Sequence, residues 1–172
     1  TRFNLNLFRY DEKADSPNVF ATEMFSITPQ DDIRTAQYKN MICSKNLIKK
    51  LLAAYKEGNI SVRTDSKDFD SWYNKRTASD GKIDFHGRTR EIYNLIRGVA
   101  APFPGAFAYV GEEKVTVWEA QPFDEMIDFS AYAPGEVIDV FDNHPIVRTV
   151  DGSLLIKKYE SEKELQAGDV LS

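Results

Sequence analysis

The sequence predicts an α/β fold in which a sheet-and-helix part is followed by a small β-barrel of the OB or SH3-like kind. Three observations support this prediction. Apolar residues alternate in residues 3–9, keep helical spacing between residues 33 and 55, and recur after residue 105 in five short β-like runs. The chain has 172 residues, of which 42% are hydrophobic, and it can bury a substantial core. This composition excludes a disordered chain.

The first 27 residues predict a β-hairpin. Phe3, Leu5 and Leu7 alternate with polar neighbours, and residues 19–27 form a second run with strand composition. The connection, residues 11–18, is rich in turn formers and long for a simple hairpin. We therefore expect this connection to have a function of its own.

A long helix is predicted next, from a start at residues 28–32 to an end at Gly58. The start has Pro29 near the first turn and the acids Asp31 and Asp32, which suit the positive end of a helix dipole. Residues 59–88 are irregular and polar, and a shorter helix is predicted over residues 89–97, stopping at Gly98.

A proline-rich joint follows the short helix in the run RGVAAPFPGAFAYVG, residues 97–111. Pro102 and Pro104 fix their own φ angles and disfavour helix at the residues before them, so the helix ends here. Gly105 permits a tight turn or close packing, and Phe103 is expected to fill the seam. The interpretation is a stiff hinge between two subdomains, residues 1–100 and 101–172.

The charge distribution limits the kinds of partner. Residues 1–100 hold 17 basic and 13 acidic side chains, whereas residues 101–172 hold 5 and 14, a local net charge of −9. An anionic ligand is therefore expected to face the first part. The single cysteine, Cys43, excludes an internal disulfide, and two distant histidines make a zinc site improbable, so no metal is predicted.

The chain shows no apolar run as long as a membrane span and no signal peptide, so a cytoplasmic location is expected. It begins at Thr1 and enters a strand pattern at once. This beginning suggests that the chain is a fragment of a longer protein.

The joint and its surroundings resemble the folate-dependent formyltransferase family, which includes methionyl-tRNA formyltransferase and the N-formyltransferases of nucleotide-linked amino sugars. The run REIYNLIRGVAAPFPGAFAYVGEEKVTVWEA, residues 90–120, looks like the passage from the catalytic domain into the C-terminal barrel. The run KRTASDGKIDF, residues 75–85, is similar to the linking loop of the family. The hairpin with Ala14-Asp15 between its strands resembles the segment that carries the catalytic aspartate.

The resemblance implies transfer of a formyl group from N10-formyltetrahydrofolate to a primary amine. The family uses an Asn-x-His pair and an aspartate, for which Asp15 is the candidate, although Pro17 stands where the family has glycine. No Asn-x-His stretch occurs in this sequence, and Asn4-Leu5-Asn6 is only an echo of it. Residues 1–100 are therefore expected to be the remnant of a Rossmann-like catalytic domain. The folate would be held mainly by a missing N-terminal half or a companion chain, and a homodimer is possible.

The linking loop borders the acceptor site in this family, so Arg76 and Thr77 are candidate substrate-binding residues. An arginine there suits the phosphates of an acceptor, and Trp72 and Tyr73 are candidates for stacking a nucleotide base. The alternatives are a solvated linker arginine and two aromatic residues of the core.

Three functions remain open from the sequence. The first is an N-formyltransferase, inactive alone, that acts on nucleotide-linked amino sugars for lipopolysaccharide or another surface polysaccharide. The second is a fragment of a methionyl-tRNA formyltransferase, which the charge of −9 over residues 101–172 disfavours because RNA affinity rests on phosphate contacts. The third is a non-catalytic module that binds a sugar nucleotide or a partner chain.

Overall fold

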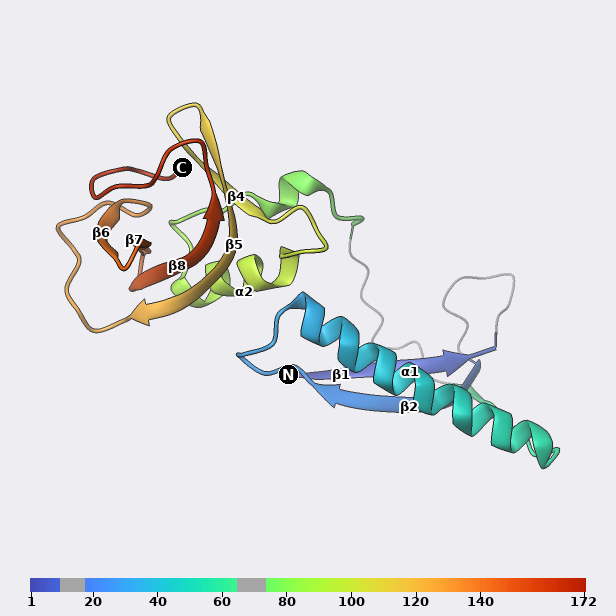
Figure 1. The fold of residues 1–172 in the computed structure, drawn as a ribbon. Coiled ribbons are helices and arrows are strands. Elements are labelled where there is room, and N and C mark those ends of the chain that lie inside the picture. The colour runs from blue at the N-terminus through green and yellow to red at the C-terminus, as the bar shows by residue number, and fades with distance from the viewer. Residues whose placement is uncertain (10–17, 65–73) are drawn as a thin grey trace. The chain divides into compact units, whose positions relative to one another are not determined.

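The structure, a computed structural model, describes residues 1–9, 18–64 and 74–172 (Figure 1). The chain divides into two compact units, residues 1–75 and 76–172, and each is described by itself. The short helix and the proline-rich joint both belong to the second unit. The functional division expected from the sequence, residues 1–100 and 101–172, stays a prediction.

The first unit contains the predicted hairpin. β1 (Arg2–Phe8) pairs antiparallel with β2 (Asn18–Ser26), and Phe3 stands opposite Phe25 with their rings stacked at a centroid distance of 5.0 Å. A two-residue strand, β3 (Arg63–Thr64), pairs with the start of β2. Both long strands lie within one residue of their predicted bounds, because the alternation of apolar residues marks them clearly.

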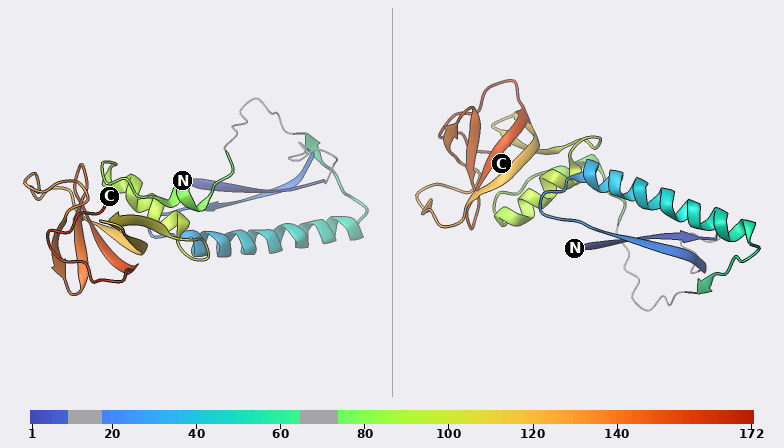
Figure 2. Two further views of the ribbon diagram at one scale, coloured as in Figure 1. Left: turned by 90° about the horizontal axis from the view of Figure 1, so that it is seen from above. Right: turned by 60° about the horizontal axis from the view of Figure 1, so that its bottom comes forward.

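The long helix, α1 (Ile33–Lys56), runs along this hairpin (Figures 1 and 2). The Asp32 side chain accepts a hydrogen bond from the Thr35 backbone nitrogen at 2.8 Å, and the Thr35 hydroxyl oxygen accepts one from the Asp32 nitrogen at 3.0 Å. This reciprocal cap starts the helix later than the sequence predicted. Residues 28–31 form a turn instead, in which the backbone nitrogen and hydroxyl of Thr28 donate to the Asp31 carboxylate.

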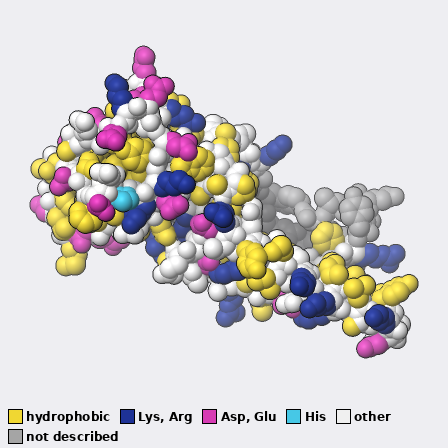
Figure 3. Space-filling model, in the orientation of Figure 1, with side chains coloured by type: hydrophobic (Ala, Val, Ile, Leu, Met, Phe, Trp, Pro, Cys, Tyr) yellow, Lys and Arg dark blue, Asp and Glu magenta, His cyan; other side chains and the backbone are white. Residues whose placement is uncertain are grey.

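One face of α1 packs on the hairpin through Cys43 and Leu47, and another face remains exposed. Figure 3 shows hydrophobic and basic side chains together on the visible side of this helix. The exposed large apolar residues of α1 are Tyr38, Met41, Ile42, Ile48, Leu52 and Tyr55. No helix among residues 1–9, 18–64 and 74–172 is both long and apolar enough to cross a bilayer.

The second unit begins with the 3₁₀ turn η1 (Ala78–Gly81) and α2 (Thr89–Val99). A sheet of five antiparallel strands follows, in the order β4-β5-β8-β7-β6. The strands are β4 (Ala106–Val110), β5 (Glu113–Asp124), β6 (Val137–Phe141), β7 (His144–Arg148) and β8 (Ser153–Glu160). The five strands expected after the joint are all present.

The closed barrel expected from the sequence is not formed by these strands. Within the described residues no ladder joins the edge strands β4 and β6. The C-terminal segment, residues 168–172, bonds to both edges instead: Tyr109 and Ser172 exchange two backbone hydrogen bonds, and the Leu171 nitrogen donates to the Gly135 carbonyl just before β6. A short irregular segment therefore occupies the place where a closing ladder was expected.

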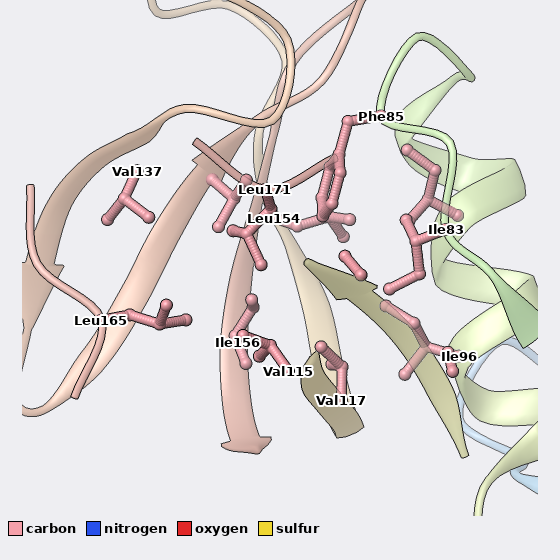
Figure 4. Packing of buried hydrophobic residues seen from close by; sticks show 14 residues of the cluster. Ile83, Phe85, Ile96, Val115, Val117, Val137, Leu154, Ile156, Leu165 and Leu171 are labelled. Carbon is pink, nitrogen blue, oxygen red and sulfur yellow. The ribbon is translucent and has the colours of Figure 1, made fainter. Parts of the chain in front are cut away.

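The core of the second unit lies between α2, the loop before it and the inner face of the sheet (Figure 4). Ile83 and Phe85 of the loop and Ile96 of α2 meet alternate residues of the central strands, including Val117 and Ile156. The period of two in β5 and β8 explains this arrangement, because every second side chain of a strand points to the same face.

Candidate functional site

The candidate site is a pocket of about 310 Å3 beside the proline-rich joint, entirely within the second unit. The linking loop and η1 contribute one side of the pocket, with Arg76, Thr77, Ala78, Asp80 and Gly81. The end of α2 and the joint contribute the other side, with Gly98, Val99, Phe103, Pro104 and Gly105. The site thus brings together two segments that are separated in the sequence, the linking loop and the proline-rich joint.

A small hydrogen-bond network shapes the η1 side of the pocket. The Thr77 backbone nitrogen donates to the Asp80 carboxylate at 2.5 Å, and the Thr77 hydroxyl donates to the same oxygen at 3.1 Å. The backbone bond from Thr77, followed by the bond from its hydroxyl and the positive charge of Arg76, lowers the pKa of Asp80 below its ordinary value. Asp80 therefore stays ionised and holds the turn in shape.

Close backbone packing joins the two sides. The Ile83 nitrogen donates to the Phe107 carbonyl at 2.7 Å, which attaches the segment after η1 to the edge of β4. A Cβ atom on Gly81 would lie 2.8 Å from the Gly105 carbonyl oxygen. Gly105 itself has φ +85°, and a Cβ atom there would lie 2.7 Å from the Thr116 side chain. A tight turn or close packing was expected at Gly105, and these short distances confirm the close packing.

The structure describes two of the five residues proposed from the sequence. Arg76 and Thr77 both line the pocket, and Thr77 is already engaged with Asp80. Asp15, Trp72 and Tyr73 lie outside the described residues, so their proposed roles stay predictions. Among the described residues, no group of three or more His, Cys, Asp and Glu side chains is placed to hold a metal ion.

Sequence reasoning missed the joint side of the pocket. Gly98 was expected to stop the short helix, but α2 continues to Val99 and Gly98 has a helical backbone. Phe103 was expected to fill the seam, but it is 45% exposed and forms a wall of the pocket. Two signals were available in the sequence: a glycine inside an amphipathic helical pattern, and an aromatic residue between two prolines.

Comparison with solved structures shows the fold of both units. HypX from Aquifex aeolicus, solved in complex with tetrahydrofolic acid, is similar with a TM-score of 0.70 and 20% identity, over 94% of this chain and 28% of that protein. WlaRD, a sugar 3N-formyl transferase solved in the presence of dTDP and 5-N-formyl-THF, is similar with a TM-score of 0.68 and 18% identity, over 95% of this chain and 56% of that protein. The N-formyltransferase from Helicobacter canadensis, solved in complex with folinic acid and dTDP-3-aminofucose, has a TM-score of 0.67 and 16% identity, over 90% of this chain and 55% of that protein.

The chain thus spans little more than half of the two sugar enzymes and less than a third of HypX. The sequence model described as the formyl transferase C-terminal domain matches residues 75–172. This match covers the linking loop, α2, the joint and the five-stranded sheet. It agrees with the resemblance read from residues 75–85 and 90–120, and the chain therefore belongs to the formyl transferase family, with residues 75–172 as its C-terminal domain.

Proposed function

We propose that this chain is part of an N-formyltransferase that moves a formyl group from N10-formyltetrahydrofolate to the amine of a nucleotide-linked amino sugar. The observation that carries the proposal is the family match over residues 75–172, which contains a pocket beside the linking loop. Similar folds in HypX and two sugar N-formyltransferases support the same reaction class. The dTDP-3-aminofucose in one of those enzymes favours a sugar nucleotide as acceptor.

The chemistry assigns Asp15 the role of proton acceptor. An amine that attacks a formyl carbonyl must lose a proton, and a carboxylate within reach accepts it. Negative charge develops on the carbonyl oxygen, and Asn and His donors stabilise it. This chain contains no Asn-x-His stretch, so those donors would come from an N-terminal half or a companion chain. The folate would be bound mainly by that same part.

The exposed face of α1 supports an association of the first unit with another polypeptide. Six large apolar side chains of this helix are exposed, including Tyr55 at 72%. Leaving apolar area in water costs about 25 cal/mol per Å2, so covering such a face stabilises a complex. We propose the N-terminal half of the catalytic domain as the partner, with a homodimer as the alternative. In this scheme residues 1–100 contribute to a Rossmann-like domain and residues 101–172 form a C-terminal module built on the open five-stranded sheet.

The remaining assignments concern the acceptor and its destination. Arg76 and Thr77 would contact the acceptor from the linking loop, and Trp72 and Tyr73 would stack against its base. Amino sugars of this type are built into surface polysaccharides, so we propose a role in lipopolysaccharide or related biosynthesis in the cytoplasm. No metal takes part in this scheme.

The experiment that tests the proposal combines this chain with an N-terminal formyltransferase half, either fused to it or co-expressed. Formyl transfer from N10-formyltetrahydrofolate to dTDP- and UDP-linked amino sugars is measured by mass spectrometry. We expect activity that is lost in Asp15→Asn and kept in the matched control Asp11→Asn, which changes a carboxylate of the same connection. Full activity of Asp15→Asn would reject the catalytic role of Asp15.

Two other functions have distinct outcomes in the same experiment. A methionyl-tRNA formyltransferase would formylate charged initiator tRNA and show salt-sensitive tRNA binding, which the charge of −9 over residues 101–172 disfavours. A non-catalytic module would bind a sugar nucleotide or a partner chain, with no transfer under any combination.

A further inference from the structure

The passage from β5 into the loop before β6 presents large apolar side chains to water (Figure 1). Met126 is 93% exposed, and its neighbour Ile127 and Phe123, near the end of β5, are exposed as well. These three residues lie within five positions of the chain, and we name residues 123–128 the β5–β6 tip. Apolar side chains that gather on a surface mark an interaction site, whereas scattered ones need no explanation.

Hydrogen bonds to Asp124 fix the shape of the tip. One oxygen of its carboxylate accepts bonds from the backbone nitrogens of Ile127 at 2.6 Å and Met126 at 2.7 Å. These bonds, from Ile127 first and then from Met126, lower the pKa of Asp124 below its ordinary value, so the carboxylate stays ionised. The Asp124 carbonyl accepts a bond from the Ser153 hydroxyl at 3.2 Å, which attaches the tip to the start of β8.

Arg148 fixes the segment that follows the tip. Its Nε donates to the Phe129 carbonyl at 3.1 Å, and its terminal nitrogens donate to the carbonyls of Gly152 at 2.8 Å and Val150 at 3.3 Å. The turn between β7 and β8 therefore holds the tip from both sides. A surface whose backbone is already ordered loses little conformational entropy when a partner binds.

The charge around the tip has one sign. Residues 115–147 contain seven acids and no lysine or arginine, and three of these acids, Asp124, Glu125 and Asp128, belong to the tip. Such a surface repels the phosphates of lipid headgroups and of nucleic acids, and it attracts the cationic side chains of a protein. The partner that suits the tip is therefore a polypeptide with lysines or arginines beside apolar residues.

Recognition at the tip must use side chains, because its backbone is not free to extend a sheet. The backbone nitrogens of Met126 and Ile127 are bonded to Asp124, and the end of β5 is paired with β8. Strand addition needs unpaired backbone groups at a sheet edge. An amphipathic helix offers an apolar face with charged residues beside it, and a methionine side chain adapts to such a face.

We propose that the β5–β6 tip binds a cationic amphipathic helix of a partner protein. Met126 and Ile127 contact the apolar face of that helix, and Glu125 and Asp128 pair with its lysines or arginines. This docking goes beyond the proposed formyl transfer and does not depend on it, so either one can fail while the other stands.

Fluorescence anisotropy of the 172-residue chain with two labelled model peptides tests the proposal. Both peptides have leucine on one helical face, and the other face is lysine in one peptide and glutamate in its counterpart. We expect the lysine peptide to bind at least about tenfold more tightly, and its affinity to fall with added salt, which screens exposed charges. Met126→Asp should weaken binding of the lysine peptide by about tenfold or more, and Glu125→Lys should weaken it as well.

Phe141→Asp is the matched control. Phe141 is an exposed apolar residue of the same acidic stretch, but it lies at the end of β6, and the antiparallel order of the strands places that end opposite the end of β5. Its substitution should leave the affinity unchanged. Asp124→Ala should weaken binding, whereas Asp124→Asn, whose amide oxygen can accept the same two backbone bonds, should retain more of it. Thermal unfolding shows whether each variant is folded.

Several results would overturn the proposal. Equal affinity for the lysine and glutamate peptides is one, and unchanged affinity in folded Met126→Asp is another. Helix α1 has six basic residues and no acid, so sedimentation of the chain is also measured. Self-association that Met126→Asp abolishes would make a second copy the partner instead. Binding to phosphatidylglycerol vesicles that Met126→Asp abolishes would make the tip a lipid site.

Discussion

Asp151 accepts two hydrogen bonds from Thr89, although the two residues lie 62 positions apart: the Thr89 backbone nitrogen is at 2.8 Å and its hydroxyl oxygen at 2.9 Å from the same Asp151 oxygen. The Thr89 hydroxyl also lies 2.6 Å from that of Thr149, and both threonines are fully buried. Thr89 is the first residue of α2, so the turn between β7 and β8 fixes the start of the helix whose other end lines the joint pocket.

Removing the Asp151 carboxylate should destabilise the second unit. Asp151→Ala takes away an acceptor that caps the first turn of α2, which costs about 1 kcal/mol in typical helices and up to about 2. Thr89→Val should also destabilise the unit, and the double variant should cost less than the sum of both, because both changes remove the bond from the Thr89 hydroxyl to the Asp151 carboxylate. Urea unfolding measures all three. The control is Glu164→Ala, an exposed acid on the loop after β8, and an equal loss in that variant would contradict the prediction.

Stability should fall at acidic pH through two carboxylates. The Lys39 ammonium, with help from Thr28, lowers the pKa of Asp31 far below its ordinary value of 3.8, and the Thr89 backbone bond lowers the pKa of Asp151. A carboxyl whose pKa is lower in the folded state stabilises that state at pH values above its unfolded pKa. The contribution is then lost as the pH falls through the folded pKa. The free energy of unfolding should therefore be constant above about pH 5 and decrease below about pH 4.

Urea titrations between pH 7 and pH 2 check this expectation. Asp151→Asn and Asp31→Asn should each be less stable than the parent chain at pH 7, and the difference should shrink at pH 2. Parent and variant curves that stay parallel over the whole range would show that neither carboxylate is linked to folding.

The sequence predicted local elements well because their signals are local. The alternation in β1 and β2, the helical spacing of α1 and the prolines after α2 each lie within one segment, and their bounds were nearly correct. The start of α1 was placed too early because Thr28 and Pro29 suit a helix start as well as the turn they form with Asp31. Whether the helix starts at Thr28 and Pro29 or after Asp32 depends on the tertiary packing of its first turn, which is not a local signal.

Only the linking-loop side of the pocket could be predicted from the sequence, because the sequence signals are local. Arg76 and Thr77 were found through resemblance of the linking loop, while Gly98 and Phe103 were interpreted as a helix stop and a filler of the seam. Their meeting depends on the backbone contact of Gly81 with Gly105, which no periodicity encodes. The open end of the sheet was missed likewise, because the five strand patterns do not reveal that residues 168–172 occupy it.

The two glycines of the joint should respond to alanine in opposite directions. Gly105→Ala places a Cβ atom 2.7 Å from Thr116 and 2.9 Å from Trp118 at a backbone with φ +85°, so we expect a loss of about 2 kcal/mol or more. Gly98→Ala meets nothing within 4 Å and should gain about 0.5–1 kcal/mol from helix propensity. Thermal and urea unfolding of both variants decide the sign. Destabilisation by Gly98→Ala would contradict this expectation, because a Cβ atom that meets no neighbour cannot strain the folded state.

The C-terminal segment provides the sharpest comparison of neighbouring side chains. Leu171 is 2% exposed within the core of the second unit, whereas the adjacent Val170 is 47% exposed. Leu171→Ala should cost about 2–5 kcal/mol, since it removes a buried side chain and leaves a cavity, and Val170→Ala should cost less than about 0.5 kcal/mol. Both substitutions keep the backbone bonds from residues 168–172 to the sheet edges, so urea unfolding compares the side chains alone. Equal losses would show that the segment stabilises the open end of the sheet through its backbone, and not through the packing of Leu171 against the core.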